Sequence, residues 1–106
     1  MANQTVVWTY RVRPGVEDEF LAVLTRQWPT LHELGFATAT PAMIYRSVQD
    51  PPTYVEIFTW TEGSPGPAHD HPDVIDIWEA IEPLLEERDG HPKQEYPLFE
   101  QVKFKA

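Results

Sequence analysis

The stretch that decides the fold is VVWTYRVRPGVEDEF, residues 6–20. Residues 6–12 are rich in β-branched and aromatic side chains in two alternating sets, which predicts a strand. Pro14 and Gly15 supply the fixed and the permissive φ angles that a tight turn needs. Three acidic residues follow, where the positive end of a helix dipole favours negative charge. The stretch therefore predicts a strand, a turn and the start of a helix.

The first helix is predicted over residues 17–34, where apolar residues recur at the spacing of one helical face. Gly35 ends this pattern, since glycine commonly follows the last helical residue. Pro29 lies inside the helix and removes one of its backbone hydrogen bonds. We therefore expect the helix to kink or restart near Trp28.

The rest of the chain contains two more strands, a second helix and a last strand. His71 precedes Pro72, a favoured first helical residue, and we expect His71 to cap that helix. Pro83 interrupts the second helix as Pro29 interrupts the first. In chain order, the predicted elements are a strand at 41–48, a turn at 50–53, a strand at 54–60, a breaker-rich loop at 61–68, a helix from 72 to about 90 and a strand at 98–104.

This βαββαβ order predicts the ferredoxin-like arrangement of the α+β class. With right-handed crossovers, it gives a four-stranded antiparallel sheet with both helices on one face. The 106 residues suffice for a single domain, 1–106.

Large side chains occupy both faces of the predicted sheet. One set is Trp8, Tyr10, Phe58 and Trp60, and the other is Val7, Met43, Tyr45, Val55, Ile57 and Phe99. If helices cover only one face, the other leaves a larger apolar patch in water than monomers usually show. We therefore expect a homodimer whose sheets meet face to face and close into an α+β barrel.

Composition excludes several classes of function. Eight basic against 17 acidic residues give a net charge of −9, so nucleic acid and anionic membranes are not expected partners. The chain has no cysteine, which excludes disulfides, thiolate metal sites and thiol catalysis. It has no apolar stretch long enough to span a bilayer and no sign of a signal peptide, so we expect a cytoplasmic protein.

Three segments together resemble the antibiotic biosynthesis monooxygenase-like family of dimeric α+β barrels. They are Arg13–Phe20, Glu56–Trp60 and the run Ala68–Val74, which leads to Trp78. The resemblance covers nearly the whole chain and implies a pocket in each monomer between the sheet and the helices. It also implies several possible activities, because some relatives oxygenate phenols or quinols without metal or flavin, whereas others bind or degrade haem or isomerise small molecules.

The chain departs from this pattern at one position. Relatives often carry a glutamate two residues before the strand tryptophan, where this chain has Phe58, and Glu56 lies one step further back on the same face. Glu56 has two interpretations, a buried base with a raised pKa or the salt-bridge partner of Arg46 across the hairpin, and we favour the salt bridge.

His69 and His71 are the candidate catalytic residues. They are the only titratable side chains in the sequence that lie close together and belong to a type suited to proton transfer near neutral pH. In the alternative interpretation, His71 caps the helix and His69 bonds a loop carbonyl. A His-x-His pair can also chelate a metal, but no third ligand lies nearby in the sequence, so we predict no metal site.

Five further residues are candidates for the pocket. Tryptophans can form flat walls for an aromatic ligand, and a tyrosine can donate a hydrogen bond to a phenolate. Each of these aromatic side chains can equally fill the core of the fold. The candidates are Trp60, Trp78, Glu56, Tyr45 and Trp28, with Trp8 as a possible extension of the wall.

The leading hypothesis is a cofactor-free monooxygenase for an aromatic or polyketide-like phenol or hydroquinone. His69 or His71 would remove a hydroxyl proton, and the resulting anion would reduce O₂ inside the pocket. The alternatives are a non-catalytic dimer that binds a small hydrophobic or aromatic ligand, a haem-binding protein that uses one of these histidines as axial ligand, and a structural dimer without a cavity.

Overall fold

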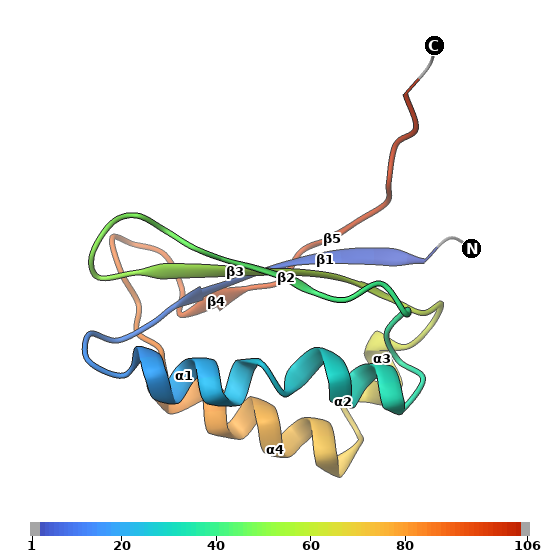
Figure 1. The fold of residues 1–106 in the computed structure, drawn as a ribbon, viewed down its shortest axis with the longest axis horizontal. Coiled ribbons are helices and arrows are strands. Elements are labelled where there is room, and N and C mark those ends of the chain that lie inside the picture. The colour runs from blue at the N-terminus through green and yellow to red at the C-terminus, as the bar shows by residue number, and fades with distance from the viewer. Residues whose placement is uncertain (1–2, 105–106) are drawn as a thin grey trace.

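The computed structural model describes residues 3–104, which form one antiparallel sheet with helices on a single face (Figure 1). Its strands follow the order β2-β3-β1-β4, and β5 also pairs with β1. This is the α+β, ferredoxin-like arrangement that the sequence predicts. The strands are β1 (Gln4–Arg11), β2 (Met43–Arg46), β3 (Thr53–Trp60), β4 (Gln94–Glu95) and β5 (Leu98–Phe99).

The helices lie together below the sheet in Figure 1. They are α1 (Glu17–Leu24), α2 (Gln27–Glu33), the short α3 (Pro65–Ala68), α4 (Pro72–Ile81) and the 3₁₀ turn η1 (Glu82–Leu84). Within residues 3–104, no helix is both long enough and apolar enough to cross a membrane.

The predicted first helix restarts, as expected, but earlier than predicted. The break lies between α1 and α2 at Thr25 and Arg26, which places Pro29 at the third residue of α2. Backbone amides in the first turn of a helix have no partner within the helix, so the missing N–H of Pro29 costs little there. The restart thus removes the conflict that the sequence pattern contains.

The predicted second helix is shorter than its apolar pattern indicates. α4 ends at Ile81, and Pro83 lies in η1, after which the chain becomes extended at Leu85. Leu85 is fully buried, but it contacts the core from a bridge to Val12 and not from a helix. The expected loop at 61–68 contains the single turn of α3.

The prediction of one last strand at 98–104 is wrong at both ends. β4 begins at Gln94, β5 ends at Phe99, and Pro97 between them interrupts the ladder along β1. Residues 100–104 form no strand and extend away from the sheet on the side opposite the helices (Figure 1).

The two faces of the sheet differ as the alternation in the strands predicts. Trp8, Tyr10, Phe58 and Trp60 point toward the helices and are at least 95% buried. No helix or strand of residues 3–104 lies over the opposite face in Figure 1, and Met43, Tyr45 and Phe99 on that face are about half exposed. The core therefore lies between the sheet and the helices, and the other face is open.

Candidate active site

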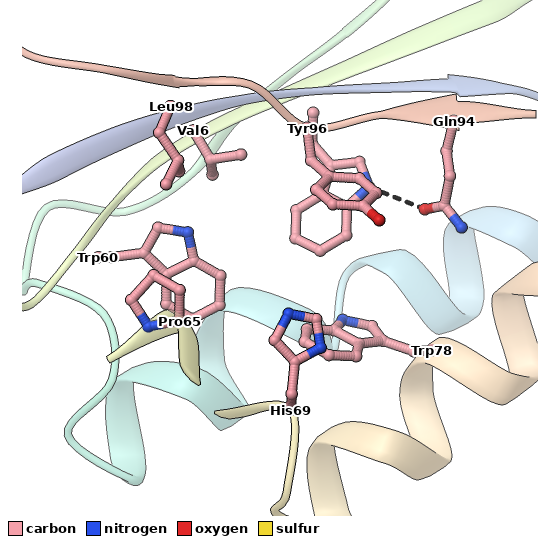
Figure 2. Close-up of a pocket in the computed structure, with 9 residues that line it drawn as sticks. Val6, Trp60, Pro65, His69, Trp78, Gln94, Tyr96 and Leu98 are labelled. Atoms are coloured by element: carbon pink, nitrogen blue, oxygen red, sulfur yellow. Dashed lines mark hydrogen bonds between the residues drawn. The ribbon is translucent and has the colours of Figure 1, made fainter. Parts of the chain in front are cut away.

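A cavity of about 230 Å³ lies between the sheet and the helices (Figure 2). Aromatic and aliphatic side chains form most of its wall, with a few polar atoms among them, as is usual for pockets that bind small molecules. The lining residues are Val6, Trp8, Trp60, Pro65, His69, Trp78, Gln94, Tyr96 and Leu98.

Segments far apart in the sequence meet at this cavity. β1 and the end of β3 contribute alternate side chains that point toward the helices, and α4 contributes Trp78. The segment from β4 to β5 adds Gln94, Tyr96 and Leu98, which share one side because strand side chains alternate.

Trp8 lies at the centre of the aromatic wall. Its ring centroid is 5.7 Å from that of Trp78 and 5.1 Å from that of Tyr96. It also stacks on Tyr10, which is fully buried behind it. These separations are those of favourable aromatic pairs, so the wall is held by contacts among its own rings.

His69 brings an imidazole to the same cavity. It directly follows α3, and its ring centroid lies 4.7 Å from that of Trp78 at an interplanar angle of 60°. Figure 2 shows the His69 ring beside Trp78 and directed toward the sheet. His69 is exposed, so a ligand in the cavity and solvent can both reach it. An imidazole in this place can accept a proton from a ligand hydroxyl.

His71 occupies a different position, although only Asp70 separates it from His69. Its Nδ1 accepts a hydrogen bond from the backbone N–H of Asp73 at 3.2 Å, so it caps α4. The ring packs edge-on against Phe36 and is not part of the cavity wall. The structure therefore confirms the expected cap and separates the two histidines.

Two of the predicted pocket residues also lie outside the cavity wall. Tyr45 is on the open face of the sheet, 55% exposed, because its parity on β2 is opposite to that of the buried set. Trp28 stacks on His32 and donates its indole N–H to the carbonyl of Thr38 at 3.2 Å. Of the predicted site residues, His69, Trp60 and Trp78 line the cavity.

Glu56 lies in the core, 1% exposed, and does not pair with Arg46. The expected salt bridge is wrong because Arg46 lies opposite Tyr54 in the hairpin and binds the carboxylates of Glu17 and Asp50 instead. Burial raises the pKa of Glu56 to about 7, while hydrogen bonds from Gln27 and Tyr10 lower it. Of the two interpretations of Glu56, the salt bridge is wrong, and the burial of the carboxyl agrees with the other, a buried group with a raised pKa.

Several residues at or behind the cavity were not singled out in the sequence. Gln27 is completely buried and joins Trp78 to Glu56 by hydrogen bonds. Gln94 and Tyr96 lie between Pro92 and Pro97. Because proline is rare inside strands, these flanking prolines make the short strand hard to recognise in the sequence. A signal was present, since Gln94, Tyr96 and Leu98 alternate as the residues of one strand face do.

The part of the chain that the structure describes has no cluster of three or more His, Asp or Glu side chains placed to hold a metal ion.

Comparison with known proteins places this arrangement among known folds. No family profile and no curated protein matches the sequence. Among solved structures, a candidate antibiotic biosynthesis monooxygenase from Bordetella bronchiseptica superposes with a TM-score of 0.75 at 14% identity, over 97% of this chain and 100% of that chain. The chain has the fold of the antibiotic biosynthesis monooxygenases.

Two further structures agree with this assignment of the fold. A variant of SnoaB, a cofactor-independent oxygenase from Streptomyces nogalater, matches with a TM-score of 0.75 at 22% identity, over 98% of this chain and 97% of that chain. A conserved protein from Methanosarcina mazei Go1 matches with a TM-score of 0.72 at 19% identity, over 96% of this chain and 95% of that chain. At these identities the monooxygenase fold is common to all of them, and the reaction must be argued from the site.

Proposed function

We propose that this chain is a cofactor-free monooxygenase that acts on a phenol or hydroquinone of the aromatic or polyketide type. The observation that carries the proposal is the placement of His69 beside a cavity walled by Trp8, Trp60, Trp78 and Tyr96. The likeness to SnoaB, which is named a cofactor-independent oxygenase, supports the same class of reaction. A cavity of about 230 Å³ suits a substrate of one or two rings better than a large one.

In this proposal, His69 is the general base. It removes the proton of a ring hydroxyl, and the electron-rich phenolate then gives electrons to O₂. For a simple phenol the reaction balances as one phenol and one O₂ giving one quinone and one water, so the substrate supplies all the electrons. We assign the base to His69 and not to His71, because the Nδ1 of His71 already accepts a backbone hydrogen bond at the start of α4.

The aromatic wall would orient the substrate and exclude water around the anion. Trp8, Trp60 and Trp78 offer flat surfaces to the ring, and the hydroxyl of Tyr96 is a donor for the developing negative charge.

We further propose that a second copy of the chain covers the open face of the sheet. That face carries half-exposed Met43, Tyr45 and Phe99, an apolar surface that water does not favour. Two sheets packed face to face would give a homodimer.

Oxygen uptake tests the proposal most directly. A panel of one- and two-ring phenols and hydroquinones is incubated with the protein while dissolved oxygen is recorded, and products are identified by mass spectrometry. We expect at least one substrate to be consumed with one O₂ per molecule. Binding of panel members without oxygen uptake would contradict the proposal and indicate a ligand-binding protein.

Substitution of single histidines then tests the base. We expect His69→Ala to lower kcat by a factor of about 10² to 10⁴, the usual contribution of a general base. His71→Ala should change kcat far less, and His91→Ala, at an exposed turn, serves as the matched control. Full turnover by His69→Ala would show that another group removes the proton.

A further inference from the structure

Two tryptophans of the cavity wall donate their indole N–H groups to glutamine amides and not to the cavity. Trp8 donates to Oε1 of Gln94 at 2.9 Å, which Figure 2 shows as a dashed line. Trp78 donates to Oε1 of Gln27 at 2.6 Å. Both rings therefore lie against the cavity while their single polar group is bound elsewhere.

Each glutamine is in turn oriented by a glutamate. The Nε2 of Gln94 donates to Glu82 at 3.2 Å, and the Nε2 of Gln27 donates to Oε1 of Glu56. An indole nitrogen only donates, and Oε1 of Glu56 and Oε2 of Glu82 accept from the amides, so each amide has one favourable orientation. The order glutamate, glutamine, tryptophan thus occurs twice around one cavity.

Of these two hydrogen-bonded series, the one formed by Glu56, Gln27 and Trp78 lies in the core. Gln27 and Glu56 are each 1% exposed, and Tyr10 closes the group by accepting from Gln27 at 2.9 Å and donating to Glu56 at 3.3 Å. Oε2 of Glu56 has no hydrogen-bond partner among residues 3–104. Burying a carboxyl in this way costs stability that an apolar pair of similar size would not cost.

We propose that Gln27 and Glu56 are positioning residues that hold Trp78 so that it presents its ring, and not its N–H, to an aromatic ligand. With the indole donors of Trp8 and Trp78 both occupied, the polar groups that the cavity offers a ligand are those of His69, Tyr96 and the indole N–H of Trp60, and the ring system lies against Trp8 and Trp78. The cavity would therefore select planar aromatic rings with a polar group at one edge. This inference concerns the ligand of the proposed function and rests on that function only for the identity of the ligand.

The first test uses the ligand-free protein labelled with ¹⁵N, in which each indole N–H gives its own NMR signal. Gln27→Met removes the acceptor of Trp78, so that signal should move upfield and exchange with solvent faster. Glu56→Leu removes one of the two acceptors of the Gln27 amide, Tyr10 being the other, and should shift or broaden the same signal. Glu56→Gln keeps an acceptor oxygen for Gln27, so the Trp78 signal should lie where it does in the unmodified protein.

Internal controls come from the other tryptophans. The indole of Trp28 is bound to a backbone carbonyl and should stay in place in all three variants. Gln94→Met is the matched change in the series formed by Glu82, Gln94 and Trp8. It should move the signal of Trp8 and leave that of Trp78 unchanged. If Gln27→Met does not fold, Trp78→Phe removes the same hydrogen bond from its donor side and is tested in the ligand assay below.

The second test measures binding of 1-naphthol by calorimetry. Loss of one buried hydrogen bond that orients the ring should weaken binding about tenfold in Gln27→Met or Trp78→Phe. Glu56→Gln should bind within about twofold of the unmodified protein, because the conservative change keeps the orientation of Gln27.

The outcomes separate the inference from the proposed function. A Trp78 signal that does not move in Gln27→Met or Glu56→Leu, or naphthol binding unaffected by Gln27→Met and Trp78→Phe, would overturn the inference. If Trp78 moves as expected while the unmodified protein neither binds naphthol nor consumes oxygen with the phenol panel, the positioning of Trp78 stands and the proposed function fails.

Discussion

Glu56 is a residue whose acid–base chemistry the structure changes near neutral pH. It lies between Tyr10 and Gln27 in the core, and burial raises its pKa from 4.5 to about 7. Near neutral pH its carboxyl is therefore divided between the neutral and the charged form. A group in this state makes the folded protein sensitive to pH in a range where ordinary carboxylates are fully ionised.

Glu56 should make the protein less stable as pH rises from 4.5 to 7. In this range the unfolded chain has released the Glu56 proton while the folded protein retains it, so raising the pH favours unfolding. The decrease in the free energy of unfolding should level off above pH 7. It should amount to about 3 kcal/mol, the equivalent of the difference between the pKa values of Glu56 in the folded and unfolded states.

Urea unfolding of the unmodified protein and of Glu56→Gln across this range measures the effect. Contributions of other groups, such as Glu17 with its lowered pKa, cancel in the difference between the two proteins. The free energy of unfolding of Glu56→Gln should rise relative to the unmodified protein as pH increases. A difference that is constant with pH would show that Glu56 ionises as easily in the fold as in water.

At the scale of the elements, the end of α2 shows how a local backbone pattern closes a helix. The backbone N–H of Phe36 donates to the carbonyl of Leu31, and that of Gly35 donates to His32, a pattern that closes many helices. Gly35 has a φ angle of +84°, and a Cβ added there would meet nothing within 4 Å.

Gly35→Ala should therefore destabilise the protein through backbone conformation alone. We expect a loss of about 1 kcal/mol in the free energy of unfolding, because an L side chain is strained at this φ angle. Thermal unfolding followed by circular dichroism measures it, with Ala22→Gly on the exposed side of α1 as a control for glycine in a helix. No measurable loss in Gly35→Ala would mean that the helix end relaxes to another conformation.

The elements with regular patterns could be predicted from sequence, and those shaped by proline and by distant contacts could not. Alternation in β1 and β3 divided the side chains between the two faces of the sheet without telling which face the helices cover, and helical spacing placed Trp78 on α4. Pro29 and Pro83 indicated that each helix is interrupted. Where each interruption lies depended on how the helix accommodates the missing N–H of its proline. Residues 98–104 alternate like a strand, yet only two of them find a partner on β1.

The residues of the candidate site also divide into those that could be predicted from the sequence and those that could not. His69, Trp60 and Trp78 could be chosen because each lies on an element with a clear pattern or next to one. Gln27 and Gln94 could not, since they act through hydrogen bonds to tryptophans 51 and 86 residues away. The local sequence of Gln27 is that of an ordinary polar residue, and the alternation of Gln94 with Tyr96 and Leu98 indicates a strand face but not a hydrogen bond. Only the folded arrangement reveals these two bonds.

At the scale of the whole molecule, a strong negative charge and an open apolar face act against each other. Two copies that pack through the sheet bring two net charges of −9 together, while the apolar contact removes half-exposed side chains from water. Added salt screens the repulsion and leaves the apolar contact intact, so association should strengthen as salt increases.

Light scattering should therefore give a mass near twice the 12.2 kDa of the chain. Ile57→Glu places a charge on the open face without touching the core, and it should reduce the mass to that of one chain while circular dichroism stays unchanged. Asp76→Asn on the exposed side of α4 should remain a dimer. A mass of one chain for the unmodified protein at high salt would contradict the role of this face.

The chain has four tryptophans, and three of them, Trp8, Trp60 and Trp78, line the cavity beside His69. The protein's intrinsic fluorescence therefore reports mainly on that cavity, and Trp28, stacked on His32 elsewhere, supplies a steady background. A planar compound that enters should quench most of the emission, whatever its reactivity. The molecule thus carries its own optical sensor, and a chemical library can be searched for its ligand before any reaction is known.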